Sequence, residues 1–267
     1  MYKITKVTAA KKTKQRYHIH LMINGQDEYA FSVSEDLLIK EELVKGKELS
    51  KEDINRLKGQ DEIDKVYQKA LGYLAFRMRS EKELRQYIKD QEMPADIIDS
   101  MVEKLIALDF LQDERFAEAF VRTKRDQSTK GPLVIRQELK QKGIADNVIE
   151  AAMAQYPREE QLDNAITLVE KKQNSYGRES QRSKEQKLMQ FLIQRGFDHT
   201  LAAEALREAT IEEDDDVELE ALRQWAEKAW RKYEGKEPYE RNRKIKEFLY
   251  RKGFSQDTIQ AWFDEQE

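Results

Sequence analysis

The hexapeptide LKQKGI at residues 139–144 returns as LIQRGF at residues 192–197 and as LYRKGF at residues 249–254. Each copy carries an apolar residue four positions before a glycine and another one position after it, with a cation directly before the glycine. A glycine in this place can take the left-handed conformation that ends a helix, and a cation there meets the negative end of the helix dipole. The hexapeptide therefore predicts a helix end and a tight turn at three places in the chain.

The similarity extends far beyond the hexapeptide. Aligned on Glu92, Gly143, Gly196 and Gly253, residues 61–267 contain four copies of one unit, with Glu92 in place of glycine in the first. The columns eight and four positions before this anchor, and one, six and nine positions after it, are apolar in every copy: Leu84, Ile88, Met93, Ile98 and Met101; Ile135, Leu139, Ile144, Ile149 and Ala152; Leu188, Leu192, Phe197, Ala202 and Ala205; Ile245, Leu249, Phe254, Ile259 and Trp262. These spacings place the columns on the inner faces of two helices that flank the turn.

A further apolar helix precedes each pair, so each unit is predicted to be a three-helix bundle. Ser80 with Glu83 forms a capping box at the second helix of the first copy, and Gly131-Pro132 starts that helix in the second. The predicted fold is mainly α, a series of helix-turn-helix-like bundles in an elongated, curved array. The predicted repeats span residues 61–111, 112–157, 158–211 and 217–267.

Residues 1–60 follow a different pattern. Residues 2–9 and 15–23 alternate in polarity, with Tyr17, Ile19, Leu21 and Ile23 on one face, and Asn24-Gly25 favours a type I′ hairpin into a return strand at 26–33. Ser34 can cap a helix, and Ser50 can cap another with Asp53 at the capping-box position. We expect a small β-hairpin or three-stranded sheet with two short helices, ending near Gly59.

Composition agrees with a helical protein and excludes several classes of function. The chain of 267 residues has 10 Gly and 4 Pro, 39% hydrophobic and 37% charged residues, and a net charge of −4. Cysteine is absent, which excludes disulfide scaffolds and cysteine-ligated zinc. No glycine-rich phosphate loop occurs, because no two glycines lie closer than twelve residues. Without an apolar run long enough for a membrane span or a signal peptide, we expect a cytoplasmic protein.

Three groups of residues invite a functional interpretation, and each has a plainer one. His18 and His20 share a strand face at a metal-ligand spacing, but no third ligand is assignable and a surface strand is favoured. The acidic run from Glu212 to Asp216 could attract Mg²⁺ or a basic partner, yet it lacks the spacing of a calcium loop and is interpreted as a solvated linker. The three tryptophans fall on core positions of helices, which favours packing over base stacking: Trp225, Trp230 and Trp262. No nucleophile is paired with a base, so no catalytic residue, metal or cofactor is predicted.

Taken together, these motifs resemble one known family. The tandem units, with ALGYLAFRMRSEKELRQYI at residues 70–88, DERFAEAFVRTK at 113–124, and LKQKGI and LIQRGF at the ends of second helices, resemble RecX, the bacterial recombination regulator. The resemblance covers about residues 66–210, and the fourth copy with the N-terminal strands matches the extended form of the family. It implies a protein without catalytic residues or a cofactor that binds the RecA–single-stranded DNA filament and modulates RecA recombination and ATPase activity in DNA repair, with inhibition as the expected direction. We further expect a monomer with at most a weak direct contact to DNA.

A local excess of cations suggests where such a partner would bind. Residues 122–142 hold seven cations against two acidic residues, a local charge of +5 in an acidic protein. These are either an ordinary solvated surface or a concave basic face for phosphates or an acidic protein groove. The candidates in the second copy are Arg122, Lys124, Arg125, Lys130, Arg136, Lys140 and Lys142; those in the third are Arg178, Arg182, Lys184 and Lys187.

Two other classes of function remain open on this sequence. Three-helix units resemble helix-turn-helix domains, so a direct nucleic-acid binder is the main alternative, although a pI of about 5.7 weighs against it. An oligomerising scaffold is the third. Binding to DNA in the absence of RecA would separate the first alternative from a filament regulator.

Overall fold

A computed structural model describes residues 1–10, 15–127, 129–211 and 215–265. Its chain divides into two compact units, residues 1–113 and 114–267, and the following paragraphs describe each by itself. None of the helices in the described ranges combines the length and the apolar character that a membrane span requires. The predicted elongated, curved array remains a prediction.

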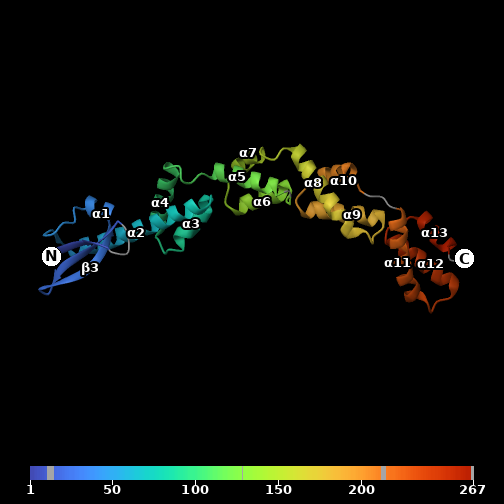
Figure 1. The fold of residues 1–267 in the computed structure, drawn as a ribbon, viewed down its shortest axis with the longest axis horizontal. Coiled ribbons are helices and arrows are strands. Elements are labelled where there is room, and N and C mark those ends of the chain that lie inside the picture. The colour runs from blue at the N-terminus through green and yellow to red at the C-terminus, as the bar shows by residue number, and fades with distance from the viewer. Residues whose placement is uncertain (11–14, 128, 212–214, 266–267) are drawn as a thin grey trace. The chain divides into compact units, whose positions relative to one another are not determined.

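The first unit begins with a small antiparallel sheet (Figure 1). Its strands follow the order β3-β2-β1-β4, and their bounds are β1 Tyr2–Ala9, β2 Arg16–Ile23, β3 Gln26–Ser34 and β4 Glu48–Leu49. Asn24 and Gly25 both have positive φ at the predicted hairpin turn. Ile19 and Leu21 lie in the core with Leu37 of helix α1 (Glu35–Lys40) and Leu57 of helix α2 (Lys51–Phe76). The predicted hairpin and its buried face are therefore confirmed, and β4 is a short fourth strand that the pattern did not reveal.

Helix α2 corrects one expectation. Ser34 and Ser50 cap α1 and α2 as predicted, and Ser50 forms the capping box with Asp53. The second of the two short helices expected here is, however, the first part of a helix of 26 residues, which continues through Gly59 to Phe76. A single glycine inside a helix costs only about 1 kcal/mol relative to alanine, so it does not end the helix. The sheet and the first three-helix repeat therefore share one helix.

Four three-helix groups follow in the chain, as the repeat predicts (Figure 1). The first consists of α2, α3 (Glu81–Lys89) and α4 (Ala95–Ala107). The second consists of α5 (Asp113–Asp126), α6 (Pro132–Gln141) and α7 (Asp146–Met153). The third consists of α8 (Arg158–Gln173), α9 (Gln181–Gln194) and α10 (His199–Glu208), and the fourth of α11 (Asp215–Tyr233), α12 (Pro238–Arg251) and α13 (Gln256–Asp264). We call them repeats one to four.

The predicted apolar columns form the cores of these repeats. Of the twenty aligned residues, all except Met93 are buried, and Met93 packs against the core of repeat one while partly exposed. Leu139 and Ile149 lie in one cluster and are 0% and 1% exposed. The turn glycines have φ of 85°, 93° and 94°, and Glu92 has φ 61°. The alignment and the left-handed turn at the three glycines are therefore confirmed, and Glu92 adopts the same conformation in the first copy, where no glycine predicted it.

In the second unit, the turn of repeat three packs against the start of the second helix of repeat two. The Gly131 amide donates to the Arg195 carbonyl at 2.7 Å, and the Leu133 amide donates to the Gly196 carbonyl at 3.0 Å. A Cβ atom at Gly196 would lie 2.7 Å from the backbone nitrogen of Val134, closer than real Cβ contacts. The glycine is therefore required for this approach as well as for the turn.

The same contact recurs between repeats three and four. The Ser180 hydroxyl, at the N-cap of α9, donates to the Lys252 carbonyl at 2.8 Å. A Cβ atom at Gly253 would lie 2.5 Å from the Ser180 Oγ. We call these two contacts the repeat joints. At each joint, the cation before the turn glycine lies beside the start of a helix in the preceding repeat: Arg195 lies beside the start of α6, and Lys252 lies beside the start of α9.

Candidate partner-binding surface

The predicted basic residues of repeat two lie on α5, on α6 and on the segments that follow these helices. Arg122, Lys124 and Arg125 occupy the last turns of α5, and Lys130 stands directly before the N-cap of α6. Arg136 and Lys140 are on α6, and Lys142 is its C-cap, as the sequence predicts. None of the seven is fully buried, so all reach the surface.

Most of these cations face a carboxylate of the same unit. Arg122 pairs with Glu118 at 3.5 Å and Lys140 with Asp146 at 2.8 Å. In addition, Lys130 pairs with Glu138, and Arg136 pairs with Glu150. Lys124 instead lies over the ring of Phe120, 5.4 Å from its centre. Most of the excess positive charge is therefore neutralised by carboxylates of the same unit. Fewer cations are available to bind a partner than the sequence suggested.

Arg125 connects two repeats. Its side chain is 24% exposed and pairs with Asp126 at 2.8 Å and with Glu160 of α8 at 3.2 Å. It also donates to the carbonyl of Gln155 at 2.9 Å. The hydrogen bond to Asp126 raises the pKa of the Arg125 guanidinium. Arg125 thus holds repeat two to the first helix of repeat three, a structural role that its sequence position did not indicate.

Of the seven predicted cations of repeat two, Arg122 and Lys140 are the most exposed. Their side chains are 45% and 59% exposed, and their carboxylate partners are exposed as well. Exposed ion pairs of this kind contribute about 0–1 kcal/mol, so a partner's acidic group could replace the internal carboxylate at little cost. These two residues are the best candidates for a contact on this repeat.

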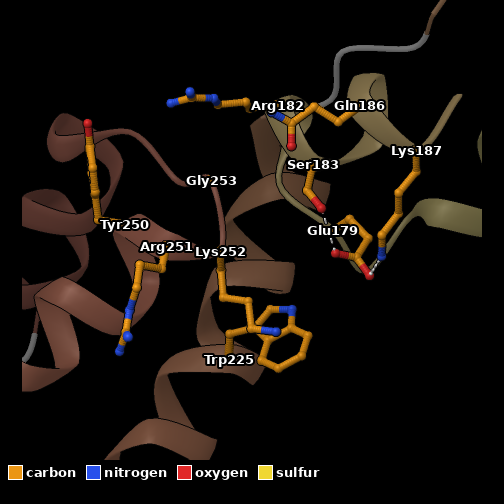
Figure 2. A pocket seen from close by; sticks show the side chains of 10 residues that line it. All are labelled: Glu179, Arg182, Ser183, Gln186, Lys187, Trp225, Tyr250, Arg251, Lys252 and Gly253. Carbon is orange, nitrogen blue, oxygen red and sulfur yellow. Dashed lines mark hydrogen bonds and ion pairs between the residues drawn. The ribbon is translucent and has the colours of Figure 1, made fainter. Parts of the chain in front are cut away.

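The basic residues of repeat three gather around the start of α9. Arg178 is exposed and precedes the Ser180 cap, while Arg182, Lys184 and Lys187 lie within the first two turns of the helix. Lys187 pairs with Glu179, and both line a cavity together with Arg182 (Figure 2). The structure therefore brings part of the predicted group together at one place.

The sequence analysis missed the other wall of this cavity. This wall consists of Trp225 of α11, Tyr250 and Arg251 at the end of α12, and Lys252 and Gly253 directly after that helix (Figure 2). Arg251-Lys252-Gly253 is the same turn that the repeat alignment identified. The turn motif is therefore visible in the sequence, but only the three-dimensional structure shows that this turn contacts the start of α9.

The remaining interpretations fall as follows. His18 and His20 lie on strand β2, where the Nδ1 of His18 and the Ser32 hydroxyl are 2.7 Å apart. Trp262 is buried in repeat four, and Trp225 and Trp230 pack partly exposed against the same core. Glu212, Glu213 and Asp214 lie outside the described residues, as do the side chains of Asp215 and Asp216. The metal and linker interpretations of the acidic run therefore stay predictions.

Family models of RecX domains match the chain along most of its length. The RecX N-terminal domain matches residues 2–50, the first three-helix domain 67–105 and the second 113–153. The third three-helix domain matches twice, over residues 159–206 and 216–263. Repeats three and four are thus two copies of one domain type.

Curated relatives and solved structures agree with these matches. The chain is 39% identical to the regulatory protein RecX of Bacillus subtilis (strain 168) over 264 residues, covering 99% of this chain and 98% of the relative. It is 38% identical to RecX of Halalkalibacterium halodurans over 263 residues, covering 98% and 99%.

A crystal structure of a regulatory protein RecX aligns with a TM-score of 0.67 at 34% identity, over 78% of this chain and all of that one. A crystal structure of RecX from Lactobacillus salivarius aligns with a TM-score of 0.53 at 37% identity, over 56% of this chain and 97% of that one. On this evidence, from its N-terminal sheet to its fourth repeat, the chain belongs to the RecX family of regulatory proteins.

Proposed function

We propose that this chain binds the RecA–single-stranded DNA filament and inhibits RecA recombination and ATPase activity during DNA repair. The observation that carries the proposal is the family match along nearly the full length, which includes every three-helix repeat. A regulator of a filament needs an accessible surface rather than a catalytic centre. The exposed cations Arg122 and Lys140 of repeat two support such a surface, because exposed ion pairs of this kind are weak enough to exchange for a partner's acidic groups.

The first test uses the cations whose loss leaves the fold intact. Reversal of Arg125, Lys130 and Arg136 is unsuitable, because these side chains are only 24%, 33% and 32% exposed, so that a new carboxylate there would face an existing one with little solvent between them, and Arg125 also holds two repeats together. The variant Arg122→Glu/Lys140→Glu removes only two exposed pairs. A matched control, Arg231→Glu/Arg243→Glu, reverses two cations of repeat four that are 82% and 60% exposed and also pair with nearby glutamates.

Binding is measured by pull-down with RecA filaments on single-stranded DNA, and inhibition by RecA strand exchange. We expect the Arg122/Lys140 variant to bind about tenfold more weakly, which corresponds to about 1.4 kcal/mol, and the control to bind like the unmodified chain. Rising salt should weaken the unmodified chain more than the variant, since exposed charges are screened within about 8–10 Å. If both variants inhibited RecA strand exchange equally, the result would show that these cations of repeat two do not form the contact. Strong binding to DNA without RecA, with no effect on strand exchange, would instead support the nucleic-acid binder.

A further inference from the structure

A cavity of about 610 Å³ opens at the joint of repeats three and four (Figure 2). The first turns of α9 form one wall with Arg182, Gln186 and Lys187, and the end of α12 forms the other with Tyr250, Arg251 and Lys252. Trp225 of α11 closes the cavity from a third side. Residues separated by about seventy positions in sequence thus meet around one space.

The charge inside this cavity is positive and largely unpaired. Its one carboxylate, Glu179, pairs with Lys187 and accepts a hydrogen bond from the Ser183 hydroxyl at 3.0 Å. Burial raises the pKa of Glu179, but the hydrogen bonds from Lys187 and Ser183, together with the nearby charges of Lys187 and Lys252, outweigh that effect and leave the pKa below its usual value, so the carboxylate is ionised. Among the described residues, no carboxylate pairs with Arg182, Arg251 or Lys252.

The cavity wall is held in place by the joint itself. The Ser180 hydroxyl donates to the Lys252 carbonyl, and the indole nitrogen of Trp225 donates to the Arg178 carbonyl at 3.1 Å. The Lys252 ammonium lies over the Trp225 ring, 3.8 Å from its centre. One of the three unpaired cations is therefore positioned before any ligand arrives, which lowers the ordering cost of binding.

We propose that this cavity binds a short acidic peptide segment of a protein partner through its carboxylates. Arg182 and Arg251 would pair with carboxylates from the two walls, as guanidinium groups do with bidentate geometry, and Lys252 would contribute a fixed positive charge between them. The proposal deepens the proposed function and rests on it for the identity of the partner, but not for the chemistry of the site.

One observation favours a peptide over a nucleic-acid strand. Single-strand binding sites stack bases on open aromatic rings. Here two ammonium groups lie over the Trp225 ring, that of Lys252 at 3.8 Å and that of Lys228 at 4.5 Å from its centre, so the ring is not open to a base.

The test measures binding of a short fluorescent peptide of alternating Asp and Glu to the full chain by anisotropy, without RecA. We compare the unmodified chain with Arg182→Glu/Arg251→Glu and with the control Arg231→Glu/Arg243→Glu, whose residues lie outside the cavity. The cavity variant should lose at least about tenfold in affinity, and the control should stay within about twofold. Circular dichroism checks that each variant is folded, and Arg182→Gln/Arg251→Gln, which should show the same loss, replaces the charge reversal if that variant unfolds.

Three results would overturn the proposal. The first is the absence of peptide binding, and the second is an equal loss in the cavity variant and the control, which would indicate diffuse attraction. The third is tighter binding of an oligothymidylate that depends on Arg182 and Arg251, which would assign the cavity to nucleic acid. If the unmodified chain binds the peptide but not RecA filaments, only the proposed function is contradicted. If it inhibits RecA normally but does not bind the peptide, only the proposal for the cavity is contradicted.

Discussion

At the scale of single residues, the turn position of the repeat has two requirements. It must adopt a left-handed backbone conformation, and at the repeat joints it must leave room for the close approach of the preceding repeat. Glu92 adopts the left-handed conformation although it has a side chain, a strain on the order of 1–3 kcal/mol, and that side chain is exposed. Gly196 has the same conformation, but any Cβ there would collide with Val134 of the preceding repeat. The turn itself tolerates a side chain, and the close approach at the repeat joint does not.

Asp198 offers a residue-scale prediction with a pH signature. It caps α10 by accepting hydrogen bonds from the Thr200 hydroxyl and, at 2.9 Å, from the Leu201 amide, and these bonds lower the pKa of its carboxyl below 3.8. Asp198→Ala should reduce the free energy of unfolding by about 0.5–2 kcal/mol at neutral pH. Because the folded pKa is depressed, this stabilisation is present above pH 3.8 and is lost as pH falls through the lower folded value.

Urea unfolding of both proteins at about pH 7 and about pH 3 measures the effect. The difference between them should shrink at the lower pH. A difference that stays constant would show that the carboxylate charge does not contribute to the cap.

At the scale of elements, the joint of repeats three and four predicts a coupling between two substitutions. Gly253→Ala would bring a Cβ to 2.5 Å from the Ser180 Oγ, so Ser180→Ala should relieve part of its cost. Gly196→Ala meets backbone and Cβ atoms of Val134 instead, and Ser180→Ala should leave its cost unchanged. A double-mutant cycle by urea unfolding should give a coupling on the order of 0.5–3 kcal/mol for the first pair and about zero for the second. Equal coupling in both cycles would show that the joint does not act through this hydroxyl.

The elements also show how far sequence patterns reach. The strands, the Asn24-Gly25 hairpin and the capped helix starts were predictable because each depends on residues close in the chain. The length of α2 was not, since Gly59 weakens a helix without ending it and the packing of Leu57 and Val66 on either side decides the outcome. Strand β4 has two residues and pairs with β1 far away in sequence, so no local pattern marks it.

The candidate surface was predictable only in part, for the same reason. The cations of repeats two and three are visible in the sequence, but the carboxylate that faces each of them is set by tertiary structure, as Glu160 of α8 shows for Arg125. The cavity at the joint of repeats three and four was missed because its walls come from two repeats. The turn of one repeat contacts the start of the second helix in the preceding repeat. A sequence rule based on this contact would predict that Arg182 and Lys252 lie close together.

At the scale of the whole second unit, a destabilising substitution in repeat two should destabilise repeat three more than repeat four. Leu139→Ala should cost roughly 2–5 kcal/mol, because the side chain is fully buried in repeat two. In a repeat protein this loss passes mainly to the adjacent repeat. Hydrogen exchange should therefore accelerate most in α6, less in α9, which the Arg195 carbonyl ties to Gly131, and least in α12. A uniform acceleration over residues 114–267 would indicate that this unit unfolds as one body.

The joint also bears on how such a chain can change over generations. Repeat three carries both halves of the contact: Ser180, a small N-cap residue that receives the turn of repeat four, and a glycine turn at Gly196 that packs against repeat two. A duplicated stretch of gene that spans one repeat therefore brings a ready-made fit at both of its ends, and repeats three and four, which match the same domain model, are such a pair. Repeat four begins α12 with Glu237 and Pro238, where repeats three and two have Ser180 and Gly131. A further turn of this kind would meet the Glu237 side chain, so the start of α12 does not provide the close fit that Ser180 and Gly131 provide.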